Sequence, residues 1–203
     1  MQGGFERAAE TRLQDGDDDV RLMLAVRAGD ASAFDTLFRR WSGPLLRYLD
    51  RMVRDASTAE ELVQETFLRV HRARERYEPE ARFSTWLYTI ATRLALNELR
   101  RPHQQHPHRS TDDADAEGRT LVLPDAGPRA DDVAHARHVG ESVEGALATL
   151  PERQRAALWL AAVEGLSYAE IAESLATTEK SVKALVHRAR CALVERLGEK
   201  AEA

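Results

Sequence analysis

Cysteine, aromatic residues and long apolar runs are all scarce in this sequence. The single cysteine, Cys191, excludes an internal disulfide and any metal site built from several cysteines. No window approaches the ~18 apolar residues of a membrane-spanning helix, and the first residues lack the apolar core of a signal peptide. We therefore expect no insertion into a membrane and a location in the cytoplasm.

The motifs of common enzyme classes are also missing. The sequence has no nucleophile elbow, no phosphate-binding glycine loop and no HExxH. His103, His106 and His108 lie in a proline-rich stretch that offers no fourth ligand at a suitable spacing. We therefore predict neither a metal nor another cofactor, and an enzyme is a weak alternative.

An overall excess of positive charge is absent too. The net charge is −5, which argues against tight DNA binding by the free chain, because affinity for DNA comes largely from neutralised phosphates. Basic residues are nevertheless concentrated in two places. Residues 69–101 hold eight Arg against four Glu, and residues 178–200 hold six basic residues against three Glu. These two segments are candidates for contact with nucleic acid.

The distribution of apolar residues predicts an all-α protein with two small helical domains. Residues 102–132 hold several Pro and Asp and no apolar run beyond LVL, so we predict a flexible linker there. The acidic residues 1–16 are predicted to be a disordered tail. The helical domains are expected at residues 17–101 and 133–198, without strands.

The first domain is predicted to contain three amphipathic helices. In the first helix, Gly43 and Pro44 should bend or break the helical stripe. In the second, Thr58 and Glu61 are predicted to form a capping box. The second helix should bury Ala59, Leu62, Val63, Thr66, Phe67 and Val70, and expose Glu60, Glu61, Gln64 and Glu65. A third helix should begin at Ser84 and expose Tyr88, Thr92, Arg93, Asn97, Arg100 and Arg101.

The second domain should end in a helix-turn-helix. Pro151 fits the start of a helix that ends before Gly165, and Ser167 with Glu170 predicts a capping box for the short helix that follows. After a turn at Ala176, the last helix should bury Val182, Leu185, Val186, Ala189 and Leu193. Its exposed residues are Glu179, Lys180, Lys183, Ala184, His187, Arg188 and Arg190. This basic face suits the major groove of DNA.

Four blocks in order carry a resemblance to a known family. They read LVQETFLRVHR, RYEPEARFSTWLYTIATRLALNELRR, LPERQRAALWLAAVEGLSYAEIAESL and VKALVHRAR. The chain closely resembles the extracytoplasmic-function (ECF) sigma factors of bacterial RNA polymerase over residues 17–101 and 133–197. The resemblance implies that residues 17–101 are sigma region 2 and residues 133–198 are sigma region 4. The protein would then bind core polymerase and direct promoter-specific transcription initiation.

The resemblance also implies partners and residues for each step. The clamp helices of the largest polymerase subunit would be bound by Glu61, Leu62, Gln64, Glu65 and Phe67. The −10 promoter element would be recognised and opened by Tyr77, Arg82, Tyr88, Arg93, Asn97, Arg100 and Arg101. The −35 element would be contacted by Thr178, Lys180, Lys183, Ala184, His187, Arg188 and Arg190. An anti-sigma factor is a further candidate partner.

The sequence departs from the family pattern in the helix-turn-helix. Ala176 stands where the family commonly has Gly, Lys180-Ser181 where it has Gly-Thr, and Ala184-Leu185 where it has Ser-Arg. Loss of that Arg removes a DNA donor, and Leu185 extends the apolar face instead. The alternative is a stand-alone helix-turn-helix regulator, which would bind duplex DNA alone and leave the first two blocks unexplained. An RNA-binding helical module is disfavoured because no aromatic strand platform is visible.

Overall fold

A computed structural model describes residues 18–101 and 143–201, and every regular element within those ranges is helical. The predicted tail at 1–16 and linker at 102–132 lie outside them. Residues 18–27 and 143–148 form helices at the start of the two described ranges. The other elements are α2 (Ala31–Val53), α3 (Ala56–Ala73), the 3₁₀ turn η1 (Arg74–Arg76), α4 (Phe83–Arg100), α6 (Glu152–Ala162), α7 (Tyr168–Ser174) and α8 (Glu179–Ala201).

Helix α2 is longer than the sequence predicts. Asp30 caps its start, accepting hydrogen bonds from the backbone amides of Ser32 and Ala33. The sequence predicts a bend or a break at Gly43-Pro44, and the break is wrong because Pro44 lies inside a continuous helix. Both halves of α2 contribute to one buried stripe that runs from Ala33 to Met52. That continuous packing offsets the hydrogen bond that Pro44 cannot donate.

Helix α3 has the predicted buried face but a different cap. Its buried residues are Ala59, Leu62, Val63, Thr66, Phe67 and Val70, which confirms the predicted inner stripe in full. The cap is Asp55, whose side chain accepts from the amide of Thr58 at 2.7 Å. The capping box predicted at Thr58 and Glu61 is therefore wrong, because Asp55 supplies the same chemistry three residues earlier.

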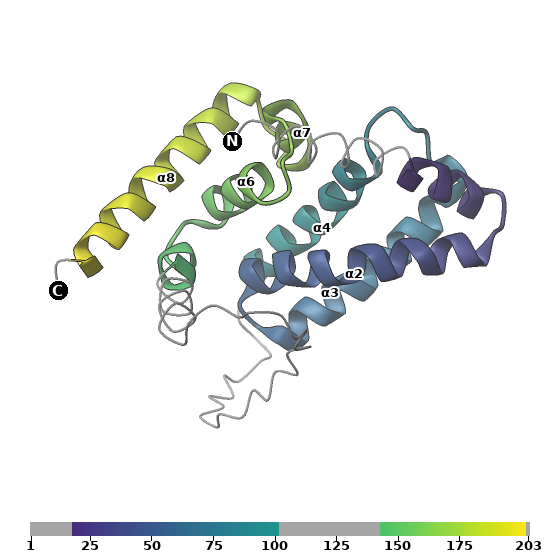
Figure 1. Cartoon of the computed structure of the whole chain (residues 1–203), viewed down its shortest axis with the longest axis horizontal. Coiled ribbons are helices and arrows are strands. Elements are labelled where there is room, and N and C mark those ends of the chain that lie inside the picture. Colours follow the sequence, from purple (N-terminus) through teal and green to yellow (C-terminus); the bar gives the residue numbers. More distant parts are fainter. Residues whose placement is uncertain (1–17, 102–142, 202–203) are drawn as a thin grey trace, which may run out of the picture.

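Helix α4 lies beside α2 and α3 and packs against both of them and against α7, so it is buried on more than one side (Figure 1). It begins at Phe83, one residue before the predicted start. Tyr88 and Thr92 are fully buried, so their predicted exposure is wrong. The hydroxyls of Tyr48 and Thr92 are hydrogen-bonded at 2.7 Å, which satisfies the polar atom of Thr92 inside the core. Contact with α2, α3 and α7 leaves α4 only a narrow exposed strip.

The second group of helices confirms the predicted helix-turn-helix. Ser167 and Glu170 form both hydrogen bonds of a capping box at the start of α7. Ile171, Ala172 and Leu175 are buried beneath the turn to α8. Gly165, after α6, has the positive φ of 68° that glycine tolerates at a helix end. Ala176, in the turn, has a φ of 47°, which costs an alanine more than a glycine.

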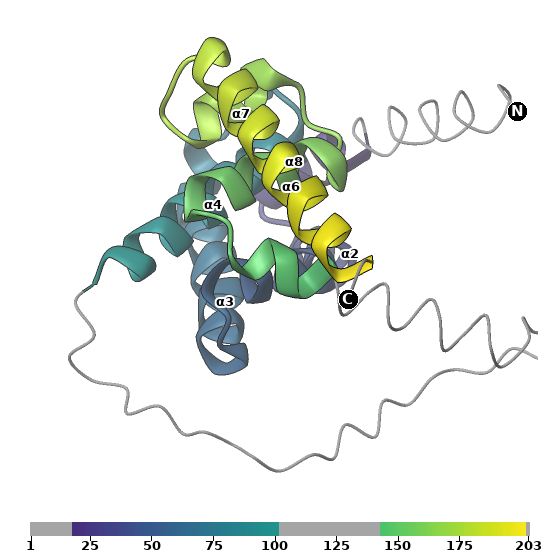
Figure 2. The same cartoon turned by 90° about the vertical axis from the view of Figure 1, so that its left-hand side faces the viewer.

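The two groups pack against each other rather than standing apart. Figures 1 and 2 show α6 and α7 between α8 and the first group of helices, with α7 lying on α4. Buried residues from both groups form one continuous apolar cluster. The sequence predicts the two groups but gives no signal for this contact.

Candidate functional site

The exposed edge of α3 joins three predicted polymerase-binding residues in one row. Glu61 and Gln64 are exposed, and the carboxylate of the half-buried Glu65 pairs with Arg69 at 2.7 Å. The hydrogen bond from Arg69 lowers the pKa of Glu65. The side chain of Leu68, which is 50% exposed, continues this row at helical spacing. We call Glu61, Gln64, Glu65 and Leu68 the docking edge.

Two residues predicted to bind polymerase are core residues. Leu62 is 7% and Phe67 is 3% exposed, and the ring of Phe67 packs edge-on against Phe34 and Phe38. Their packing in the core holds α3, and with it the docking edge, in position. Sequence reasoning missed the exposed Leu68. A signal was present, because an apolar residue on an otherwise polar helix face calls for an explanation.

The residues predicted for the −10 element divide into an exposed and a buried set. Arg93, Asn97 and Arg100 are exposed at helical spacing along α4 and form what we call the α4 strip. Arg82 is exposed before the first turn of α4. Arg101 is exposed after the last turn and pairs with Glu98 at 2.9 Å. Four guanidinium groups and one amide are therefore exposed along α4 and at its two ends, where they can approach a nucleic-acid strand.

The two tyrosines predicted for the −10 element are buried instead. The ring of Tyr77 lies 4.9 Å from that of Trp86, and its carbonyl accepts from Arg27 at 3.0 Å. Tyr88 is fully buried, with its ring against Trp41 and Tyr48. Burial, together with the charge of Glu164, raises the pKa of Tyr88. Neither ring is available for base stacking in this structure.

The residues predicted for the −35 element lie on α8 or, in the case of Thr178, directly before it. Lys180, Lys183, Ala184, His187, Arg188 and Arg190 are exposed, as predicted. Thr178 stands before the first turn, and its hydroxyl accepts from the amide of Ser181 at 3.2 Å. We call this set the α8 face. Leu185 is half-buried and packs against the apolar core, so it extends the apolar side of α8, as predicted.

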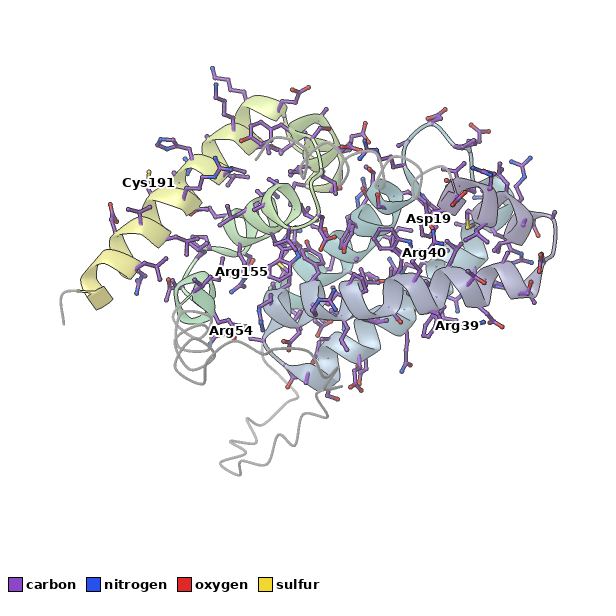
Figure 3. The ribbon with its side chains drawn as sticks, viewed as in Figure 1. Asp19, Arg39, Arg40, Arg54, Arg155 and Cys191 are labelled. Carbon is purple, nitrogen blue, oxygen red and sulfur yellow. The ribbon has the colours of Figure 1, made fainter. Side chains whose placement is uncertain are left out.

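Other candidate sites are weaker. Figure 3 shows Cys191 on the outer side of α8, and its sulfur lies 3.8 Å from Nδ1 of His187 on the preceding turn. No group of three or more metal-binding side chains occurs among the described residues. His103, His106 and His108, for which no metal site is predicted, lie outside the residues that the structure describes.

Among the described residues, no helix is both long and apolar enough to cross a membrane.

Both groups of helices match regions of a known protein family. Residues 37–105 match sigma-70 region 2, and residues 140–193 match sigma-70 region 4. CarQ, an RNA polymerase sigma factor of Myxococcus xanthus, is 38% identical over 178 residues, covering 87% of this chain and 96% of CarQ. The ECF sigma factor SigM of Mycobacterium tuberculosis is 34% identical over 180 residues, covering 89% of this chain and 85% of SigM.

The chain belongs to the ECF sigma factors of the sigma-70 family. Region 2 of this sigma factor contains α3 and α4, with the docking edge and the α4 strip. Region 4 contains the helix-turn-helix with the α8 face. As a member of this family, the chain is an alternative sigma factor that directs RNA polymerase to promoters and initiates transcription.

Two solved structures share the fold of this sigma factor. CnrH, in complex with the cytosolic domain of CnrY, aligns with a TM-score of 0.64 at 23% identity, covering 90% of this chain and 99% of CnrH. RpoE of Bartonella quintana, in complex with the anti-sigma factor NepR, aligns with a TM-score of 0.58 at 19% identity, covering 81% and 96%. Both alignments include helices from the two regions.

Proposed function

We propose that the sigma factor binds core polymerase through the docking edge of α3. Glu61, Gln64 and Glu65 present acidic and amide groups beside the exposed apolar side chain of Leu68. A basic coiled-coil partner, such as the clamp helices of the largest polymerase subunit, would complement this surface in charge and apolar contact. The exposed apolar side chain of Leu68 within a row of acidic and amide groups on α3 is the observation that carries the proposal.

The α4 strip is proposed to hold the opened −10 element. The Arg93 and Arg100 guanidinium groups can bind phosphates, and the Asn97 amide can bond to a base edge. Arg82 supports the same strand from the loop before α4. Tyr77 and Tyr88 are left out of this set, because their rings help to build the core. Stacking on an unpaired base must therefore come from another group.

The α8 face is proposed to read the −35 element in the major groove. Lys180 and Lys183 are on the first two turns of α8, where a recognition helix approaches base edges. Ala184 is small enough for close approach, and His187 and Arg188 can donate to bases or phosphates. The half-buried Leu185 does not replace the arginine of the family pattern.

The net charge of −5 supports action inside the polymerase complex. The chain would work in the cytoplasm and leave RNA synthesis to the polymerase, without catalysis of its own. Acidic segments suppress nonspecific DNA contact by the free chain, and the basic surfaces act once docking positions them. A protein that covers both regions, as an anti-sigma factor does, would block these surfaces.

Binding to purified core polymerase tests the docking proposal. The variant Gln64→Ala/Glu65→Ala should bind core at least tenfold more weakly, because it removes two polar groups from the centre of the docking edge. The control Asp35→Ala/Arg39→Ala changes two exposed residues of α2 and should bind like the wild type. Affinity can be measured by fluorescence anisotropy of the chain labelled at Cys191.

Two results would contradict the proposal. One is equal core affinity of the docking variant and the wild type. The other is absence of core binding together with a tight shift of duplex promoter DNA by the chain alone. The second result would favour a stand-alone helix-turn-helix regulator.

A further inference from the structure

The loop between the 3₁₀ turn η1 and α4 has few bonds of its own. Residues 78–82 are all exposed. Among the backbone hydrogen bonds of the described residues, one lies wholly within this loop, from the Glu80 amide to the Glu78 carbonyl at 2.9 Å. A segment with so few internal bonds and so little burial opens easily unless its ends are held. The conformation of the loop therefore depends on the residues that hold its two ends.

Both ends of the loop contact the indole of Trp86. The centroid of the Tyr77 ring lies 4.9 Å from that of Trp86, and the centroid of the Phe83 ring lies 6.1 Å from it. Tyr77 is 3% exposed and Phe83 is fully buried. Aromatic packing therefore fixes where the loop begins and ends. It does not fix the direction in which the chain leaves Tyr77, because the ring can stay packed while the peptide group beyond it turns.

That direction is set by Arg27, the last residue of the helix at residues 18–27. Its Nη1 atom donates to the carbonyl of Tyr77 at 3.0 Å. Because the peptide group is planar, a bond to this carbonyl also sets the orientation of the amide of Glu78. Hydrogen bonds from a charged donor are stronger than those from a neutral one. We call the bond from Arg27 to the Tyr77 carbonyl the loop anchor.

The helix that carries Arg27 is itself held by a buried carboxylate. Asp19 is 1% exposed, accepts from Nε1 of Trp41 at 3.0 Å and pairs with Arg40 (Figure 3). The helix at residues 18–27 is therefore attached to α2 and gives the loop anchor a fixed base. This helix precedes residues 37–105, which match region 2. A residue outside the matched region thus holds a loop inside it.

The charges of the loop make its orientation important. Arg82 is the cation proposed to support the opened −10 strand, whereas Glu78 and Glu80 carry the charge that phosphates repel. A loop that turned freely would present these carboxylates to the strand as well as the guanidinium. A binding group needs supporting residues that hold it in the productive orientation. The loop anchor supplies such support at the start of the loop.

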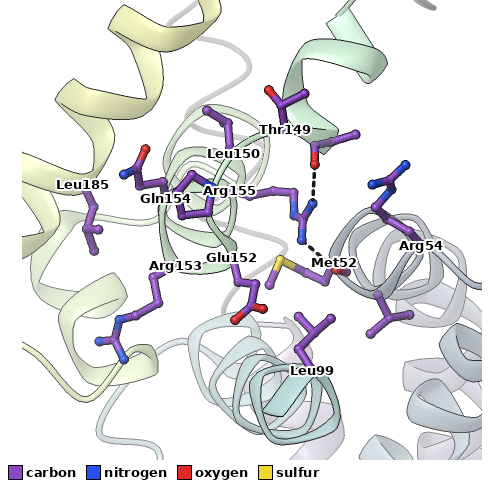
Figure 4. A pocket seen from close by; sticks show the side chains of 13 residues that line it. Met52, Arg54, Leu99, Thr149, Leu150, Glu152, Arg153, Gln154, Arg155 and Leu185 are labelled. Atoms are coloured by element: carbon purple, nitrogen blue, oxygen red, sulfur yellow. Dashed lines mark hydrogen bonds between the residues drawn. The ribbon is translucent and has the colours of Figure 1, made fainter. Parts of the chain in front are cut away.

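An arginine that donates to main-chain carbonyls occurs a second time in this molecule. Arg155 of α6 donates to the carbonyls of Met52 at 3.0 Å and Ala148 at 3.3 Å, beside a crevice of about 700 Å³ (Figure 4). Arg155 is 5% exposed, so its replacement would leave polar groups unpaired in the core. Arg27 is exposed, so water can bond to the Tyr77 carbonyl in its place without holding it in one direction. Substitution of Arg27 should therefore leave the fold intact.

We propose that Arg27 is a positioning residue for promoter opening, which orients the loop through the Tyr77 carbonyl so that Arg82 faces the opened −10 strand. Arg27 itself does not touch DNA. The inference rests on the proposed function of Arg82 for its consequence. The loop anchor can be measured in the free chain, without polymerase or promoter.

Amide hydrogen exchange in the free chain, followed by NMR, tests the loop anchor. The amides of Tyr77 and Glu80 are hydrogen-bonded to main-chain carbonyls at 3.2 and 2.9 Å. In Arg27→Ala both amides should exchange about tenfold faster, because the loop loses a charged hydrogen bond at its start. Arg27→Lys keeps a charged donor and should restore part of the protection.

The matched control is Arg21→Ala, which removes an exposed arginine of the same helix. Arg21 pairs with Asp18 on the preceding turn at 2.9 Å. Its removal should leave the exchange of Tyr77 and Glu80 like that of the wild type. Circular dichroism and a thermal scan of each variant show whether its helices remain folded.

Promoter opening by the polymerase complex tests the consequence of the loop anchor. A promoter that is transcribed with this chain is labelled in its −10 element with 2-aminopurine, whose fluorescence rises as the bases unstack. At saturating polymerase complex, Arg27→Ala should open this promoter about five- to tenfold more slowly. Arg27→Lys should recover part of the rate, and Arg21→Ala should open the promoter like the wild type.

The salt dependence of binding to a single-stranded −10 oligonucleotide separates positioning from direct contact. Arg82→Ala should reduce the slope of log affinity against log salt concentration by about 0.7, the value for one phosphate of a single strand. Arg27→Ala should weaken binding and leave the slope unchanged, because the charge that meets the phosphate is still present.

Unchanged exchange at Tyr77 and Glu80 in Arg27→Ala would overturn the loop anchor. A slope reduced as much in Arg27→Ala as in Arg82→Ala would overturn the positioning role, because Arg27 would then contact a phosphate itself. Faster exchange with an unchanged opening rate would overturn its part in opening. An unchanged slope in Arg82→Ala would refute the proposed function of Arg82 instead, and the exchange rates would still decide whether the loop anchor exists.

Discussion

Ala176, in the turn of the helix-turn-helix, has a backbone conformation that favours glycine over alanine. Its φ of 47° lies in the left-handed region, where a Cβ is unfavourable and glycine is not. The side chain is exposed, so it contributes little packing to offset that cost. The sequence alone indicated this position, because alanine stands there in place of the family glycine.

We expect Ala176→Gly to stabilise the chain by ~0.5 to 1 kcal/mol, because it relieves the left-handed strain without loss of buried surface. The melting temperature should rise by about 1 to 4 °C in a thermal scan of this chain length. The matched control is Ala169→Gly, an exposed site inside α7, which should lower stability by a similar amount. A fall in melting temperature for Ala176→Gly would contradict this.

The periodicity of apolar residues in the sequence predicted the buried face of some helices better than that of others. For α3, with one apolar stripe, the sequence predicted all six buried residues. For α4 it failed at Tyr88 and Thr92, because α2, α3 and α7 bury this helix on several sides. In a sequence, the hydroxyl of a tyrosine or threonine suggests a surface residue. Thr92 can nevertheless be buried because its hydroxyl is hydrogen-bonded to that of Tyr48.

The basic side chains of α8 lead to a prediction about how promoter affinity depends on salt concentration. Each phosphate neutralised by a basic side chain contributes about 0.9 to the slope of log affinity against log salt concentration. Lys183→Ala/Arg188→Ala should therefore weaken promoter binding by the polymerase complex and reduce that slope by about 2. Filter binding across a potassium chloride series gives both quantities.

The charge-matched control for this experiment is Arg21→Ala/Arg39→Ala, which removes two exposed arginines of the first group of helices, outside the proposed DNA surfaces. Its slope should remain that of the wild type. An unchanged slope for Lys183→Ala/Arg188→Ala would show that the α8 face does not contact phosphates.

At the scale of the whole molecule, the sequence predicted two helical units but not their closed packing. The contact uses side chains with roles inside their own helices, such as Glu170, which also caps α7. Arg155 binds backbone carbonyls, which leave no trace in a residue pattern. An acidic molecule with two basic surfaces held close together suits a subunit that becomes competent for DNA only after docking.

Run-off transcription tests the central claim most directly. Purified bacterial core polymerase is mixed with the chain on a pool of genomic promoter fragments, and the transcripts are sequenced at their 5′ ends. We predict discrete start sites that appear only when the chain is added and weaken with Gln64→Ala/Glu65→Ala. Transcripts identical with and without the chain, under conditions where it binds core, would contradict its action as a promoter-specific sigma factor.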